Sequence, residues 1–136
     1  MTLDIRPVDE RDDDDIDLVV ALNNAAEPDY PLTADELRDR RDRRAPKLRC
    51  QRYVATLDGI PAALGGYSQH EFSYHPGHFH VSGRVLDAFK GQGVGTALHE
   101  RVLAGLEPFA PVRLAASTRD NRPDALAFLA ERGYVE

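Results

Sequence analysis

Glycine occupies every second position in one short segment of this chain, Lys90-Gly91-Gln92-Gly93-Val94-Gly95-Thr96. Residues 79–86, before it, are rich in strand-forming side chains, and residues 94–106 carry apolar side chains at the spacing of one helix face. A run of glycines disfavours the interior of a strand or a helix, but it suits a tight turn. We therefore predict a strand that enters a glycine turn, from which a helix starts directly.

The predicted turn has the chemistry of a phosphate site. Backbone N–H groups at a helix N-terminus converge on one point, and the helix dipole adds about half a positive charge there. Glycine leaves the approach to these amides open, and Thr96 adds a hydroxyl in the first helical turn. The dinucleotide fingerprint would need a third glycine at position 96, and a P-loop would need Gly-Lys-Ser/Thr at its end. A tight turn without a ligand stays the alternative.

Periodicity and turn residues predict the other elements. Aspartates 12–15 suit the start of a helix, and Thr33 with Glu36 forms a capping box. Asp58-Gly59 predicts a hairpin turn. The predicted strands are 3–8, 53–57, 62–68, 79–86 and 112–116, and the predicted helices begin near residues 12, 33, 94 and 121. The order β-α-α-β-β-β-α-β-α indicates an α/β (α+β) fold, a single domain over 1–136 with a mixed sheet covered by helices.

Composition and charge exclude several classes of protein. The net charge of −6 argues against a nucleic-acid-binding protein, which usually carries a basic face. Arginines and lysines gather between residues 38 and 52, but acidic residues alternate with them, which predicts a solvated helix face; a docking surface for an acidic partner is the alternative. We expect neither a membrane span nor a signal peptide. Cys50 is the only cysteine, so the chain cannot form an internal disulfide, and we expect a cytoplasmic protein.

At the glycine turn the chain resembles the GNAT superfamily of acyl-CoA N-acyltransferases. The segment Lys90-Gly91-Gln92-Gly93-Val94-Gly95 is similar to that family's central motif, Gln/Arg-x-x-Gly-x-Gly/Ala, and residues 85–89 precede it in register. Residues 121–134 resemble the family's last helix, which commonly ends in Gly-Phe or Gly-Tyr. The resemblance covers nearly the whole chain through the element order. It implies a GNAT-like, mostly antiparallel sheet.

The resemblance also implies acetyl-CoA as co-substrate and a primary amine as acceptor. The pyrophosphate would lie on the amides from Gln92 to Thr96, and the pantetheine arm would pair with the strand edge near Val85 and Leu86. The amine would attack the thioester directly, so neither a protein nucleophile nor a metal is expected. The implied cofactor-binding residues are Val85, Leu86, Lys90, Gly91, Gln92, Gly93, Val94, Gly95, Thr96 and Asn121.

Candidates for removing the proton of the amine lie between residues 70 and 80. Four histidines fall in this stretch, and we consider Glu71, His78 and His80 as general bases, acting directly or through water. A zinc site needs three or four converging ligands, and Cys50 lies far away in sequence, so we predict no metal site. Imidazoles at the surface or at strand ends are the simpler interpretation.

The chain departs from the family pattern at three places. Lys90 replaces the usual Gln or Arg. Leu129 stands where many members have the tyrosine that protonates the leaving thiolate. The sequence ends at Glu136, whereas the family usually continues with two more strands, so we expect missing or truncated C-terminal strands and an open sheet edge. The chain could be the N-terminal repeat of a tandem protein, could complete its sheet in a homodimer, or could be an incomplete sequence.

These observations predict an N-acetyltransferase domain that transfers an acetyl group from acetyl-CoA to a primary amine of a small molecule or peptide. The alternative is a non-catalytic GNAT-like module that binds CoA or serves assembly, which Leu129 and the early end of the sequence favour. The expected partners are acetyl-CoA and an amine, with no nucleic acid and no membrane. The sequence does not name the acceptor.

Overall fold

The computed structural model describes residues 2–72, 74–116 and 123–135, and it contains one five-stranded sheet in the order β1-β2-β3-β4-β5. The strands are β1 (Leu3–Pro7), β2 (Cys50–Leu57), β3 (Ile60–Ser68), β4 (His78–Val85) and β5 (Arg113–Ala115). The helices are α1 (Asp13–Ala26), α2 (Ala34–Arg43), α3 (Val94–Leu106) and α4 (Pro123–Glu131). The predicted element order is confirmed, and two short 3-10 helices that were not predicted, Asp87–Phe89 and Glu107–Phe109, flank α3.

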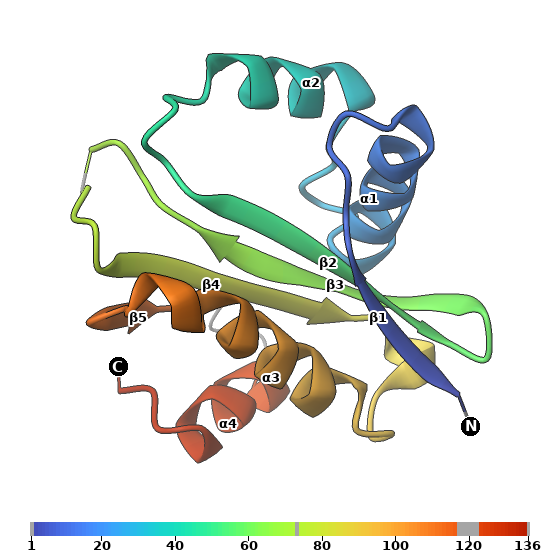
Figure 1. Cartoon of the computed structure of the whole chain (residues 1–136). Coiled ribbons are helices and arrows are strands. Elements are labelled where there is room, and N and C mark those ends of the chain that lie inside the picture. The colour runs from blue at the N-terminus through green and yellow to red at the C-terminus, as the bar shows by residue number, and fades with distance from the viewer. Residues whose placement is uncertain (1, 73, 117–122, 136) are drawn as a thin grey trace.

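The sheet is mixed and mostly antiparallel, as expected. Strands β1 to β4 pair antiparallel with their neighbours, whereas β5 pairs parallel to β4. Helices α1 and α2 cover one face of the sheet, and α3 and α4 cover the other (Figure 1). Each face has its own apolar core, one built around α3 and one around α1 and α2.

The predicted hairpin turn is present between β2 and β3. Asp58 and Gly59 have φ angles of 52° and 80°, as a two-residue turn with both central residues left-handed requires. The preceding strand is longer than predicted, because it begins at Cys50 and not at Tyr53. The register pairs Cys50 with Ser68, so partner β3 extends β2 into a polar stretch that has little strand propensity of its own.

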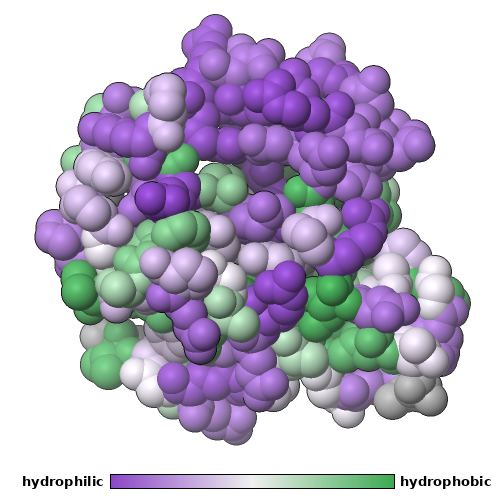
Figure 2. Space-filling model, viewed as in Figure 1, coloured by the Kyte–Doolittle hydropathy of each residue, from purple (hydrophilic) through white to green (hydrophobic). Residues whose placement is uncertain are grey.

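The two predicted helix caps also form. The Asp12 carboxylate accepts from the N–H groups of Asp14 and Asp15 at 2.8 and 3.2 Å, and Thr33 Oγ1 accepts from Glu36 N–H at 3.1 Å. The outer face of α2 is hydrophilic (Figure 2), and its arginines pair with nearby acids. This arrangement is the solvated helix face that the alternating charges predicted.

Helix α3 carries the apolar stripe that its sequence predicted. Val94, Leu98, Val102 and Leu106 are buried against the sheet, so this helix is held firmly on β2 to β4. Its first residue follows the glycine turn at the C-terminal end of β4. No helix in the described part of the chain is long and apolar enough to cross a membrane.

Candidate functional site

Strand β4 separates from β5 part-way along its length. The two strands pair only from His78 to His80 of β4, which lie opposite Arg113 to Ala115 of β5. Within the described residues, β4 continues from Val81 to Val85 with a strand partner on the β3 side alone. The sheet is therefore open at the C-terminal half of β4.

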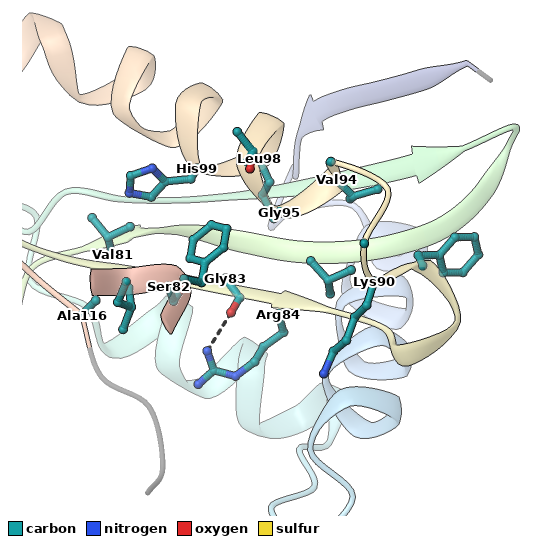
Figure 3. Close-up of a pocket in the computed structure, with 17 residues that line it drawn as sticks. Val81, Ser82, Gly83, Arg84, Lys90, Val94, Gly95, Leu98, His99 and Ala116 are labelled. Atoms are coloured by element: carbon teal, nitrogen blue, oxygen red, sulfur yellow. Dashed lines mark hydrogen bonds between the residues drawn. The ribbon is translucent and has the colours of Figure 1, made fainter. Parts of the chain in front are cut away.

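The backbone of β4 presents hydrogen-bonding groups to this opening. Arg113 N–H donates to Gly77 O at 3.0 Å on the β5 side, and Leu86 N–H donates to Ala62 O at 2.9 Å on the β3 side. Backbone groups alternate between the two sides of a strand, so odd-numbered residues of β4 face the β5 side. Beyond the pairing of His80 with Ala115, the residues whose N–H and C=O groups both face the opening are Gly83 and Val85. The Arg84 guanidinium donates to Gly83 O at 2.8 Å (Figure 3), which agrees with that alternation.

The glycine turn needs glycine at two positions for conformational reasons. Gly91 and Gly93 have φ angles of 78° and 81°, in the left-handed region that other residues avoid. A Cβ atom at either position would meet nothing within 4 Å, so the space above the turn is open. Gly93 is the N-cap of α3 and supplies no capping side chain. The first amides of α3 therefore keep the donor capacity and positive dipole end that an anion requires.

Gly95 has a different role. A Cβ atom there would lie 3.2 Å from Phe128 Cε2 and 3.4 Å from Val85 Cγ2. Its missing side chain allows α4 to approach α3 closely. The packing of the two helices therefore requires a glycine at this third position of the segment.

A cleft of about 410 Å³ joins the open half of β4 to the glycine turn. Its walls come from β4, the turn, α3, Ala116 after β5, and α4 (Figure 3). Of the predicted cofactor-binding residues, those that line it are Val85, Lys90, Gly91, Gly93, Val94, Gly95 and Thr96. Leu86 and Gln92 are not part of this lining, and Asn121 lies outside the described residues.

Two basic side chains lie close to the turn. Lys90 Nζ lies 3.0 Å from Asp87 Oδ1. Arg132, at the end of α4, donates to Thr96 Oγ1, and its Cζ lies 3.4 Å above the Phe128 ring centroid. Sequence reasoning missed Arg132, because nothing local relates it to the first turn of α3.

A histidine in the wall of the cleft pairs with a tyrosine, and the sequence predicted neither of the two. His99 of α3 lines the cleft, and its Nε2 lies 3.0 Å from Tyr134 Oη. Burial lowers the pKa of His99, with a further lowering from Arg132 and an opposing effect of Glu100. Burial raises the pKa of Tyr134. A polar residue beside the apolar stripe of α3 was the only signal in the sequence.

The candidate bases lie outside this cleft lining. His80 is half-buried on β4, and its pKa is lowered by burial first and then by His70 and Arg84. His78 stacks on His75 with 4.2 Å between ring centroids, and Glu71 is exposed in a turn. The structure thus places His78 and His80 on one face of β4, while Glu71 belongs to a separate loop.

The face of β4 that carries His80 looks toward α1. Its even-numbered side chains lie opposite Phe79 and Val81, which are in the α3 core. Arg84 on this face donates to Glu27 Oε1 at 2.8 Å, and Glu27 is buried at the end of α1. Among the described residues no group of three or more His, Cys, Asp or Glu side chains is arranged to hold a metal ion.

The sequence model of the acetyltransferase (GNAT) family matches residues 18–134. The chain belongs to this family. Among curated proteins, no sequence matches it. The segment that resembles the GNAT motif is the glycine turn described above, and Leu129, for which the sequence predicted the position of the family's tyrosine, lines the cleft.

Solved structures with the same fold include several N-acetyltransferases. An aminoglycoside N-acetyltransferase in complex with CoA has a TM-score of 0.76 at 20% identity, with 99% of this chain and 89% of that chain covered. A ribosomal-protein alanine N-acetyltransferase from Escherichia coli has a TM-score of 0.75 at 17% identity, covering 99% and 79%. An aminoglycoside 6'-N-acetyltransferase from Acinetobacter baumannii has a TM-score of 0.73 at 19% identity, covering 99% and 92%. These likenesses establish the GNAT fold of this chain.

Proposed function

We propose that this acetyltransferase moves the acetyl group of acetyl-CoA to a primary amine of a small molecule or peptide. The observation that carries the proposal is the cleft that joins the open half of β4 to the glycine turn of α3. A long thioester with an anionic end matches these two features. The anionic end meets helix amides, and the amide-containing arm meets an unpaired strand edge.

In this proposal the pyrophosphate binds the amides at the start of α3, and Lys90 contributes positive charge beside them. The pantetheine arm then follows β4 as an added strand would, along the backbone groups of Gly83 and Val85. Gly83 O already accepts a hydrogen bond from Arg84, so the arm either shares this carbonyl or displaces the guanidinium. A backbone N–H of the strand polarises the thioester carbonyl.

We propose His80 as the group that takes the proton of the amine. It lies at the point where β4 and β5 separate, because His80 and Ala115 form their last pair. A lowered pKa keeps the imidazole neutral at pH 7, as a base requires. Glu71 and His78 stay candidates of lower rank, since Glu71 is exposed and the His78 ring is stacked on His75.

Calorimetric titration with CoA and with acetyl-CoA tests the binding half of this proposal. We expect both to bind with one site per chain, and a folded protein that binds neither would disprove it. Release of free thiol from acetyl-CoA, measured over a panel of amines, tests the chemical half. The panel includes aminoglycosides and a peptide with an N-terminal alanine. These amines are chosen because solved structures of the same fold include an aminoglycoside N-acetyltransferase and a ribosomal-protein alanine N-acetyltransferase.

A non-catalytic CoA-binding or assembly module is the second candidate. Leu129 favours it, because an apolar side chain lines the cleft where the family pattern has an acid. This alternative predicts CoA binding without turnover on any amine. Cytoplasmic localisation, and a second chain or GNAT domain that covers the β5 edge, are also proposals; light scattering would detect a homodimer.

A further inference from the structure

Leu129 cannot donate a proton to the leaving sulfur, but a titratable side chain, His99, lines the same cleft. We propose that His99, hydrogen-bonded to Tyr134, delivers the proton that the leaving CoA sulfur needs. This inference rests on the proposed acetyl transfer and adds the residue that completes it.

The position of His99 fits the sulfur end of a bound thioester. His99 lies over Val81, and Ala116 marks the same end of the cleft, whereas Lys90 and the glycine turn lie at the opposite end (Figure 3). A ligand anchored by its phosphates at the turn extends toward His99 when it follows β4. Leu129 of α4 lines this cleft as well, so His99 and Leu129 border the same cleft from two different helices.

Neighbouring rings hold the imidazole in place. The His99 ring packs edge-on against Phe128 with 6.0 Å between centroids, and against Tyr134 with 5.8 Å. Nε2 is 3.0 Å from Tyr134 Oη, so Nδ1 is the nitrogen that we assign to the cleft. A positioned donor of this kind contributes more to catalysis than a mobile one.

The protonation states suit a relay. The charged groups that act on His99 are Arg132 at the end of α4 and Glu100 on α3, and with burial they leave the imidazole neutral at pH 7 because its pKa is lowered. Tyr134 keeps its proton, because burial raises its pKa. The relay uses the tautomer in which the phenol donates to Nε2 and the imidazole carries its own proton on Nδ1.

The proton transfers balance as follows. The amine nitrogen forms a bond to the acetyl carbon, and the bond from that carbon to sulfur breaks, with its electron pair going to sulfur. Sulfur takes the proton from His99 Nδ1 while Tyr134 Oη passes its proton to Nε2. The tyrosinate regains a proton from solvent, which receives the one that the amine released. No oxidant or further co-reactant is required.

Steady-state kinetics on the acceptor found in the amine panel test the relay. We expect His99→Leu to lower kcat by about 100-fold, the scale of general acid catalysis, with the KM for acetyl-CoA changed less than about threefold. Tyr134→Phe keeps the ring and should also lower kcat and shift the alkaline limb of its pH profile. Circular dichroism and thermal melting confirm that each variant is folded.

A reciprocal exchange distinguishes an acid from a packing residue. We expect Leu129→Tyr, combined with His99→Leu, to restore a large part of kcat, because it returns a phenol to the position where the family pattern has one. Leu129→Tyr alone is the reference. A double variant as slow as His99→Leu, together with an unchanged pH profile in Tyr134→Phe, would overturn the relay.

Binding of CoA and of desulfo-CoA, which lacks only the thiol, tests the inference without turnover. We expect CoA to shift the His99 imidazole signals in NMR spectra, and desulfo-CoA to bind with a clearly smaller shift. Equal shifts with both ligands would overturn the assignment of His99 to the sulfur and leave the proposed function intact. Failure of the wild-type protein to bind either ligand would overturn the proposed function, and the relay with it.

Discussion

At the scale of single residues, the glycine segment serves two separate needs. Gly91 and Gly93 adopt left-handed φ angles and border open space, while Gly95 is required by the nearby Phe128 ring. Gly59 in the hairpin shares the backbone conformation of Gly93, with φ at 80°, and lies away from the cleft. It is therefore a matched control for the turn.

We predict that Gly93→Glu abolishes CoA binding, whereas Gly59→Glu leaves the dissociation constant unchanged. Both substitutions force a side chain into a left-handed conformation, which costs about 1 kcal/mol of unfolding free energy. Only the first adds a carboxylate at the proposed pyrophosphate site. Calorimetry and urea unfolding on both variants provide the check, and a Gly93→Glu protein that binds CoA normally would contradict the site.

His80 leads to a prediction about pH. Because its pKa is lowered, the imidazole stays neutral below the usual histidine value of about 6.5. We expect kcat/KM to remain high at pH 6.5 and to fall on further acidification, as the base becomes protonated. His80→Gln should remove this acid limb and slow the reaction, while His78→Gln should retain it. An identical profile in His80→Gln would assign the base elsewhere.

At the scale of elements, α3 connects the glycine-turn end of the cleft to the sheet core. Its buried stripe fixes the helix on the sheet, and the face beside this stripe presents Gly95 and His99 to the C-terminal part of the chain. Helix α4 contributes Phe128 and Leu129 to the cleft, so the position of α4 decides the width of the site.

We predict that Gly95→Val separates these two helices. The added side chain would press on Phe128, and overpacking of this kind costs about 1–3 kcal/mol. The variant should unfold at lower urea concentration and bind CoA more weakly. For the unfolding measurement, Gly83→Ala is the control, since its Cβ would meet nothing within 4 Å. If Gly95→Val were as stable as the wild type, close packing would not explain this glycine.

At the scale of the whole molecule, a buried charge joins the first strand to the first helix. The Asp15 carboxylate accepts from Arg6 at 2.8 and 3.0 Å and from Asp9 N–H at 2.8 Å. Arg6 is the main cause of the lowered pKa of Asp15. The carboxylate thus stabilises the fold above its unfolded pKa of about 3.9, and that contribution is lost as pH falls through the lower folded value.

Asp15→Asn should therefore lower the unfolding free energy at pH 7 by about 1–2 kcal/mol, a figure reduced because Arg6 is half-exposed. The difference from the wild type should shrink as the pH falls below 4, and urea unfolding at several pH values measures it. Asp42→Asn, which removes an exposed pair with Arg41, should have a much smaller effect. Equal effects of the two substitutions would contradict the special role of Asp15.

The sequence by itself determined those features of the fold that depend on residues close together in the chain. The order of elements, the caps at Asp12 and Thr33, the Asp58-Gly59 turn and the stripe of α3 depend on contacts within a few positions. The glycine motif indicated the family because it, too, is a pattern of residues close together in the chain. Helix periodicity, turn conformation and capping are local properties that can be inferred from residue order.

Only the tertiary structure decided how the site is assembled. His99 meets Tyr134 across 35 positions, and Thr96 meets Arg132 across 36, so no local pattern could pair them. The separation of β4 from β5 after His80 depends likewise on strand pairing. The polar first residues of β2 adopt strand conformation because they pair with β3, where Cys50 lies opposite Ser68. Contacts between residues distant in sequence arise from packing and strand pairing, which residue order alone does not show.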